Sequence, residues 1–294
     1  MKIAISGASG PIGHALQVSL LADGHQVLTL VRREASAPTE VRWDPMGGDV
    51  DTAALAGVDA VVHLAGQPAA VRRWTEGFKR EFRDSRVVGT TTIARALATM
   101  QAPPAVLVSQ SAIGYYGDTG SAAVDETAPS GNDFFAEVTR SWEAAATPAA
   151  DAGIRVVHPR TGLVVTRTGG AFGPLRALTA AGLGGRMGSG RQYWSFISLA
   201  DEVRALRFLI DTPLHGAANL TAPHPATNGE ITDILGRLLH RPTLLPVPAF
   251  ALRATVGDFA VQIVGSARVV PHVLTEAGFT FLHPTADAAM QTIA

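Results

Sequence analysis

The sequence predicts an α/β fold in which helices cover both faces of a parallel β-sheet. Short apolar runs, bounded by glycine or polar residues, recur along the chain and are separated by segments with helical spacing. This alternation is typical of a doubly wound sheet with right-handed crossovers. The runs are almost continuously apolar, as expected for strands buried on both faces. The predicted strands are Lys2–Ser6, Gln26–Val31, Ala60–Leu64, Ala105–Ser109 and Arg155–His158.

The first strand runs directly into a glycine-rich turn, and a helix is predicted over Ile12–Leu21. In such a unit, backbone N–H groups and the helix N-terminus are directed at the position of a pyrophosphate. The glycines allow a tight turn, close approach of phosphates and close packing of the helix. A turn that is merely tight is the alternative, but the context favours a Rossmann-type dinucleotide site. The predicted cofactor-binding residues of this turn are Gly7, Ser9, Gly10, Pro11, Ile12 and Gly13.

The second strand ends beside the expected adenosine ribose, where a site that prefers NAD carries Asp or Glu. This chain has Arg32 and Arg33 there. A guanidinium can pair bidentately with a 2′-phosphate and offers nothing comparable to a bare hydroxyl, so we predict NADP(H) as the cofactor. A solvated basic pair is the alternative. Leu64, Ala65 and Gly66, which end the third strand and follow it, complete this part of the predicted cofactor site.

Composition excludes several classes of partner. Of the 294 residues, 47% are hydrophobic and 17% are charged, with a net charge of −1, so no overall field attracts nucleic acid or anionic lipid. The chain contains no cysteine, and its nine histidines form no cluster with metal-ligand spacing, so no metal site is predicted. With no predicted signal peptide or membrane span, we expect a cytoplasmic protein that acts on a small molecule. Its oligomeric state, including a homodimer, is left open.

After Gly162 the alternation of apolar strands and helical segments becomes less regular, which predicts a second lobe. We place the nucleotide-binding core at residues 1–165, with later segments returning to it, and a substrate-binding C-terminal lobe at residues 166–294. Further predictions beyond Gly162 are strands over Tyr193–Ile197, Leu244–Val247 and Phe279–Phe281 and helices over Leu199–Asp211 and after Pro284.

Several segments together resemble the extended short-chain dehydrogenase/reductase superfamily. The glycine turn, His63–Gly66, Gly89-Thr90 and Ser109–Ala112 carry this likeness. A narrower resemblance, to the atypical "epimerase family" with a small C-terminal domain, rests on motifs spread over essentially the whole chain. They are Arg73–Glu76, Ser111–Gly117, Trp142-Glu143, Pro159–Gly162, Gly188–Gln192 with Trp194-Ser195, Asn219–Pro223 and Leu244–Pro248. The resemblance implies an NADP(H)-binding fold and leaves the substrate unassigned.

The resemblance breaks at the usual acid/base pair. Standard superfamily members use Tyr-x-x-x-Lys on the helix after the serine strand, where the lysine charge lowers the tyrosine pKa. In this chain the only lysines are Lys2 and Lys79, and the expected helix around Asn132–Ala146 contains no tyrosine. At the required spacing that helix offers Phe135 with Thr139, or Ala136 with Arg140. The usual pair is therefore absent.

Ser111, Tyr115 and Tyr116 are the candidate catalytic residues. Ser111 lies at the carboxyl edge of the sheet, where ligands bind in open α/β folds, although it can equally be a serine that closes a strand. Tyr115 or Tyr116 can replace the missing tyrosine, or both can belong to an aromatic loop. The arginine of the helix, Arg140, is a candidate for binding the nicotinamide ribose.

Three residues are candidates for substrate binding: Trp74, Arg191 and Trp194. Glu143 is expected to be solvated or to pair with an arginine, and Asp201 is expected to cap a helix.

Two functions follow from this sequence. The first is an NADP(H)-dependent oxidoreductase or epimerase-like enzyme, in which Ser111 and Tyr115 or Tyr116 polarise a substrate oxygen. The alternative is a catalytically weak or inactive NADP(H)-sensing protein that regulates a partner. The intact cofactor motif fits both functions. The enzyme is the leading hypothesis, and the missing acid/base pair weakens it.

Overall fold

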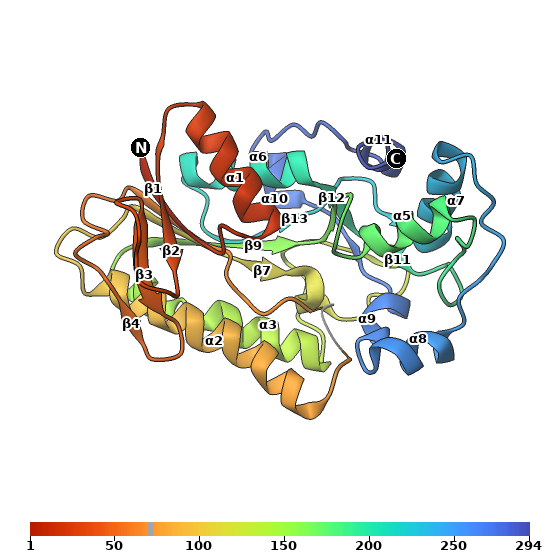
Figure 1. The fold of residues 1–294 in the computed structure, drawn as a ribbon, viewed down its shortest axis with the longest axis horizontal. Helices are drawn as coiled ribbons and strands as arrows, with labels where there is room; N and C mark the ends of the chain where they lie inside the picture. The colour runs from red at the N-terminus through yellow and green to blue at the C-terminus, as the bar shows by residue number, and fades with distance from the viewer. Residues whose placement is uncertain (70–72) are drawn as a thin grey trace.

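The computed structural model describes residues 1–69 and 73–294 and contains a nine-stranded sheet (Figure 1). Along the main path the order is β13-β9-β6-β5-β1-β2-β3-β4, and β7 extends the edge of β9. Neighbours are parallel except for β3 and β4, which confirms the predicted parallel sheet. The strands are β1 (Lys2–Ser6), β2 (Gln26–Val31), β3 (Glu40–Asp44), β4 (Asp49–Val50), β5 (Ala60–His63), β6 (Val106–Ser109), β7 (Ser111–Ala112), β9 (Arg155–Thr161) and β13 (Gly216–Leu220).

Helices cover both faces of this sheet (Figure 1). On one face, α1 (Pro11–Ala22) and α6 (Leu199–Asp211) pack on alternate strand residues such as Ile3 and Ile5. On the other face, α2 (Glu76–Ala98) and α4 (Thr147–Asp151) pack on the intervening residues, such as Ala4, and α3 (Phe134–Ala144) lies beside α2. The period of two along each strand therefore divides the core into two layers. Among the described residues, every helix is too short or too polar to cross a bilayer.

Most predicted elements of the core are confirmed within a residue or two, and the helix Leu199–Asp211 matches α6 at both ends. The strands predicted over Leu244–Val247 and Phe279–Phe281 are wrong. Prolines flank and interrupt the first segment and remove donors for a ladder, so Leu244 and Val247 form only isolated bridges with Gly185 and Met187. The second segment instead places Phe279 in the core beneath α6.

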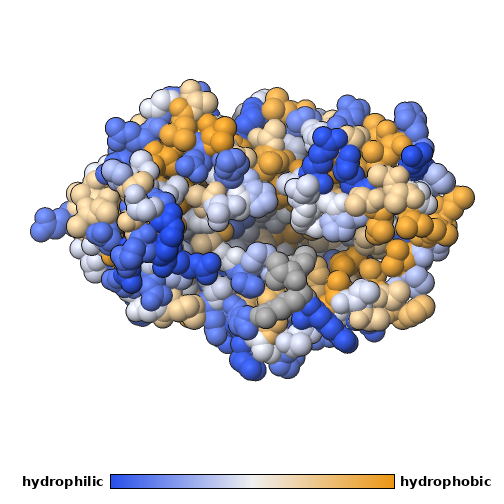
Figure 2. All heavy atoms as spheres, viewed as in Figure 1, coloured by the Kyte–Doolittle hydropathy of each residue, from blue (hydrophilic) through white to orange (hydrophobic). Residues whose placement is uncertain are grey.

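A second, smaller core lies beyond the main sheet. It includes Phe172, Trp194, Leu235 and Met290. Its surface exposes large apolar side chains, with Leu244 at 82% and Phe250 at 76% exposed, and this end of the molecule is rich in hydrophobic residues in Figure 2. The remaining elements are η1 (Ile113–Tyr116), β8 (Ala123–Val124), β10 (Leu163–Val165), α5 (Phe172–Ala180), β11 (Tyr193–Trp194), β12 (Phe196–Ser198), β14 (Ala226–Thr227), α7 (Asn228–Leu238), α8 (Ala249–Val256), α9 (Ala260–Val264), β15 (Arg268–Val269), α10 (His272–Glu276) and α11 (Ala286–Gln291).

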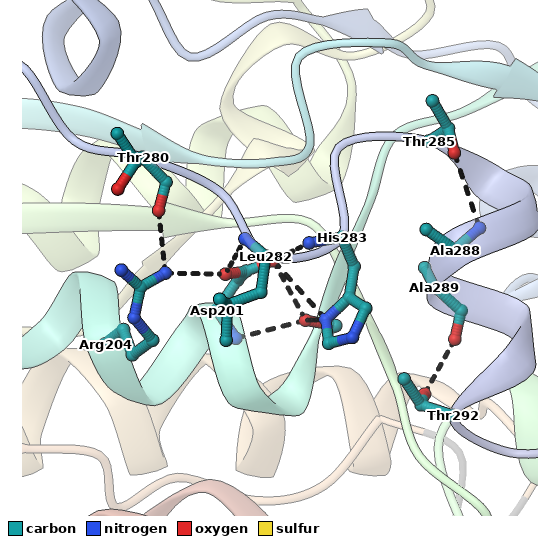
Figure 3. A network of polar contacts seen from close by, with 10 residues as sticks. Asp201, Arg204, Thr280, Leu282, His283, Thr285, Ala288, Ala289 and Thr292 are labelled. Carbon is teal, nitrogen blue, oxygen red and sulfur yellow. Dashed lines mark hydrogen bonds and ion pairs between the residues drawn. The ribbon is translucent and has the colours of Figure 1, made fainter.

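The C-terminal segment is fastened to α6 by a buried carboxylate (Figure 3). Asp201 accepts hydrogen bonds from the backbone N–H groups of Leu282 and His283, both at 2.8 Å, and is fully buried. The expectation that Asp201 caps the helix is wrong, because Ser198 is the N-cap and accepts from the Asp201 N–H at 3.0 Å. The Asp201 carboxylate binds the returning chain and also accepts from the Ser198 Oγ and the Arg204 Nη1, both at 3.1 Å.

Candidate functional site

The glycine turn between β1 and α1 is tightly packed at Gly7 and Gly13 and leads into a helix whose first N–H groups have no side-chain cap. Gly7 has a φ of +73°, and a Cβ added there would lie 2.8 Å from the Ala65 nitrogen. A Cβ added to Gly13 would lie 2.4 Å from the Gly7 carbonyl oxygen. Gly10 is the N-cap of α1 and brings no side chain to cap its first N–H groups. These groups are therefore available to an anion such as a pyrophosphate.

Two buried residues hold the neighbouring strand end against this turn. The Ser6 Oγ lies 2.6 Å from His63 Nδ1 and accepts from the N–H groups of Leu64 and Ala65, both at 3.2 Å. Burial lowers the pKa of His63 to about 4, so the ring is neutral at pH 7. Sequence reasoning missed this contact, although Ser6 and His63 end adjacent parallel strands in register. The result is a fixed position for Leu64–Gly66 beside Gly7.

The two arginines after β2 differ in their surroundings. The Arg33 guanidinium forms an ion pair with Glu40 and donates to the Ser36 Oγ at 3.0 Å and the Glu34 carbonyl at 2.8 Å. Hydrogen bonding from Arg33 lowers the pKa of Glu40 to about 2. Arg32 is exposed and is joined to no other described residue by a hydrogen bond or ion pair. Of the pair, Arg32 is the one left for a ligand.

A third arginine, which sequence reasoning missed, lies beneath Gly66. Arg86 of α2 donates to the carbonyls of Gln67 at 3.0 Å and Phe82 at 3.1 Å, and its Cζ lies 3.5 Å from the Phe82 ring centroid. A Cβ added to Gly66 would be 3.6 Å from that Cζ. Within the described part of the chain no carboxylate pairs with Arg86, and burial lowers its pKa to about 9. The Arg86 guanidinium, which has no carboxylate partner among the described residues, therefore lies beside Gly66 of the predicted cofactor site.

Ser111 belongs to a buried polar cluster at the carboxyl end of the sheet. Its Oγ donates to Glu143 Oε1 at 2.7 Å, and Ser111 is 1% exposed. Arg160, at the end of β9, binds both Glu143 oxygens, through Nε at 2.8 Å and Nη2 at 2.9 Å. The expectation that Glu143 is solvated or pairs with an arginine is confirmed in its second form. Arg160 lies within the Pro159–Gly162 motif, but sequence reasoning assigned it no role in the site.

The two tyrosines of η1 both lie beside the Arg160 guanidinium, but their hydroxyl groups differ in their hydrogen bonds. Tyr116 donates to Asn219 Oδ1 at 2.8 Å and accepts from Arg160 Nη1 at 2.9 Å. Burial raises the pKa of Tyr116 to about 12. Tyr115 is partly exposed, its ring centroid lies 3.4 Å from the Arg160 Cζ, and its hydroxyl bonds to no described residue. Tyr116 is thus fixed in place, while the Tyr115 hydroxyl is available.

The other candidates form no hydrogen bond or ion pair with the side chains of this cluster within the described part of the chain. Trp74 is 5% exposed, stacks on Phe259 and donates to the Ala69 carbonyl at 2.8 Å. Trp194 is 4% exposed and belongs to the second core. Arg140 is exposed and donates to Ser130 Oγ and the Gly131 carbonyl, both at 2.7 Å, and Arg191 is exposed beside the Ser189 turn. Their ligand contacts stay predictions.

No metal-binding group of three or more His, Asp or Glu side chains occurs among residues 1–69 and 73–294.

Two family models match this chain. The model of the NAD dependent epimerase/dehydratase family matches residues 3–220, and a domain of unknown function, DUF1731, matches residues 247–293. The first match covers the main sheet and the polar cluster. The second covers α8 to α11.

Similar proteins extend over the same length. Epimerase family protein MT2273 of Mycobacterium tuberculosis is 46% identical, covering 98% of this chain and 96% of its own. Human epimerase family protein SDR39U1 is 34% identical, covering 100% and 99%.

Solved structures agree with these matches. The human SDR39U1 structure, solved with NADPH, has a TM-score of 0.92 and 33% identity, covering 100% of this chain and 99% of that one. A nucleoside-diphosphate sugar epimerase from Corynebacterium glutamicum has a TM-score of 0.81 and 32% identity, and the match covers 99% of this chain and 57% of that one. The turn, the sheet and these matches identify the chain as a member of the NAD-dependent epimerase/dehydratase family.

Proposed function

We propose that this chain binds NADP(H) and acts as an oxidoreductase or epimerase-like enzyme on a small-molecule carbonyl or alcohol. One observation carries the proposal: the glycine turn and the polar cluster occupy the same edge of one parallel sheet. Ser6, His63, Ser111 and Arg160 stand at or just beyond the carboxyl ends of neighbouring strands. Ligands of open α/β folds bind at this edge.

Support for NADP(H) comes from the fit of the residues present. The glycine turn offers backbone N–H groups to a pyrophosphate, and Arg32 is free to pair with a 2′-phosphate. Arg86 adds an unpaired cation on the β5 side of the turn, the side away from Arg32. The NADPH of the human SDR39U1 structure agrees with this assignment.

When bound, a nicotinamide cofactor supplies or accepts a hydride. The residues of this chain then have to bind the substrate oxygen and move its proton. The hydroxyl groups of the Ser111–Tyr116 segment are the candidates, and Arg160 provides a fixed positive charge beside them. A positive charge next to a developing oxyanion lowers the barrier to carbonyl reduction.

A sensing protein is the second candidate. Its support is the absence of the Tyr-x-x-x-Lys pair, since Phe135 and Thr139 occupy α3 at that spacing. In such a protein the bound cofactor stabilises one conformation and no hydride is transferred.

The test begins with binding. NADPH should raise the melting temperature of the purified protein, and so should adenosine 2′,5′-bisphosphate, which carries only the adenosine end of the cofactor. Arg86→Gln should weaken NADPH about tenfold, the size of one lost charged hydrogen bond, and leave the bisphosphate unchanged. Absence of any melting shift with NADPH contradicts the proposal.

Catalysis is tested by following NADPH absorbance with panels of carbonyl compounds and nucleotide sugars. Turnover of any compound supports the enzyme. A protein that binds NADPH tightly and consumes none of it with the whole panel supports the sensor instead.

A further inference from the structure

We propose that Tyr115 is the proton donor of this site and that Arg160, stacked on its ring, replaces the missing lysine. This inference rests on the proposed function and names the residues that carry its chemistry. Of the three candidate hydroxyl groups, on Ser111, Tyr115 and Tyr116, it selects that of Tyr115. The positive charge then comes from β9, whereas the usual lysine lies on the helix that corresponds to α3.

The position of Tyr115 is the first argument. A Cβ added to the preceding residue, Gly114, would lie 3.5 Å from the Phe135 Cβ and 3.7 Å from the Thr139 Oγ1. Phe135 and Thr139 are the α3 residues at the spacing of the usual Tyr and Lys. The η1 turn therefore brings Tyr115 next to the part of α3 from which a tyrosine is missing.

Availability of the hydroxyl is the second argument. Ser111 is 1% exposed and its proton is donated to Glu143. Tyr116 is 5% exposed and its hydroxyl is bonded on both sides. Of the three candidates only Tyr115 is partly exposed with a hydroxyl that bonds to no described residue, so only it can reach a ligand without breaking a contact.

The third argument is the way in which Arg160 is held. Glu143 binds its Nε and Nη2, and Nη1 donates to Tyr116, which fixes the guanidinium plane against the Tyr115 ring. Burial opposes the charge, but the hydrogen bond with Glu143 raises the pKa of Arg160 above its ordinary value. A permanent cation 3.4 Å from the ring centroid lies where it can stabilise negative charge that develops on the Tyr115 oxygen as the proton is transferred. Glu143 and Ser111 are positioning residues that orient Arg160.

The step balances with NADPH as the hydride donor. The substrate carbonyl carbon takes the hydride, and its oxygen takes the proton of the Tyr115 hydroxyl, so C=O becomes CH–OH and NADP⁺ remains. The Tyr115 phenolate, stabilised by Arg160, regains a proton from water. The reverse direction oxidises a secondary alcohol by the same transfers.

Nitration by tetranitromethane tests this assignment without a known substrate, because the reagent attacks phenolates and the chain has no cysteine to compete. Peptide mapping reports Tyr115, Tyr116 and Tyr193 separately. In Glu143→Gln/Arg160→Met, which removes both charges and nearly keeps the side-chain sizes, nitration of Tyr115 should slow about tenfold. Arg160→Lys, which keeps the positive charge, should retain most of the nitration rate of Tyr115. Tyr193, whose ring faces Arg268 at 4.7 Å, is the internal control and should not change.

A second arm uses the unaltered protein. Saturating NADPH should protect Tyr115 from nitration, while adenosine 2′,5′-bisphosphate should not, because only NADPH reaches the nicotinamide end. A melting shift with NADPH but no protection of Tyr115 overturns the inference and leaves the proposed function intact. Nitration of Tyr115 at the parent rate in the double variant also overturns it, since Arg160 would then have no effect on the reactivity of that hydroxyl. No melting shift with NADPH defeats the proposed function itself.

Discussion

Arg32 and Arg33 are adjacent in the sequence, but only one of them is free. Arg33 is held by Glu40, Ser36 and a carbonyl, and so it organises the loop after β2. We therefore expect Arg32→Ala to reduce the preference for NADPH over NADH about tenfold or more, because a bidentate phosphate contact is lost. Cofactor affinities from fluorescence titration measure this preference. Arg33→Ala is the matched control and should retain most of it; equal losses in both variants would contradict the division of roles.

Glu202 is a residue whose charge state depends on burial. It is fully buried on α6, accepts from the Thr161 Oγ1 at 2.8 Å, and burial raises its pKa to about 8. Between pH 4.5 and 8 the folded chain keeps a proton that the unfolded chain has released, so the free energy of unfolding falls with rising pH by about 1.4 kcal/mol per unit from this group.

The test of this linkage is Glu202→Gln, which stays neutral at every pH. Relative to the parent, its free energy of unfolding should rise by about 2 kcal/mol between pH 6 and 8, measured in urea. His63 and His158 titrate alike in both proteins and cancel. If the free energies of unfolding of the two proteins changed equally with pH, Glu202 would not hold a proton in the folded chain.

At the scale of elements, the turn between β1 and α1 is the most constrained unit. A Cβ at Gly13 meets backbone, namely the Gly7 carbonyl oxygen at 2.4 Å and the Ala8 Cα at 2.8 Å, and neither can rotate away. Gly13→Ala should therefore destabilise the fold by about 1–3 kcal/mol and weaken NADPH binding. Gly77→Ala is the control, since its Cβ on α2 has no contact closer than 3.8 Å and helix propensity favours alanine. Urea unfolding compares the two variants, and equal midpoints would argue against a packed turn.

Elements with strong local patterns were predictable, and elements defined by their partners were not. The strand β1 and the helix α6 follow from apolar periodicity alone. The strands β3 and β13 were missed because β3 carries charged residues at alternate positions and β13 carries glycine and alanine, so that pairing with β2 and β9 defines them. Proline-rich Leu244–Val247 has strand-like composition but lacks the donors of a ladder.

At the scale of the molecule, distant parts of the chain are fastened together by a few buried polar contacts. Asp201 binds the backbone of residues 282 and 283 and so joins the C-terminal segment to the nucleotide-binding core (Figure 3). Asp201→Ala leaves two backbone donors without their acceptor, and we expect a loss of about 2–4 kcal/mol in the free energy of unfolding. The loss should be accompanied by faster hydrogen exchange across residues 280–294. Asp287→Ala, which breaks an exposed ion pair with Arg237, is the control and should change stability by less than about 1 kcal/mol. Equal effects of the two variants would contradict the fastening role.

The parallel sheet, the glycine turn and the arginines that point to NADP(H) were predictable from the sequence, because these features depend on residues that are neighbours along the chain. The sequence also showed that the usual lysine is absent. The packed fold shows which arginine after β2 has no partner among the described residues and which tyrosine hydroxyl bonds to none of them. Ser111, Glu143, Arg160 and Asn219 come from separate elements and meet only when β7, α3, β9 and β13 pack at one edge of the sheet. Burial then favours their pairing, because a charge or polar group that is removed from water without a partner costs free energy.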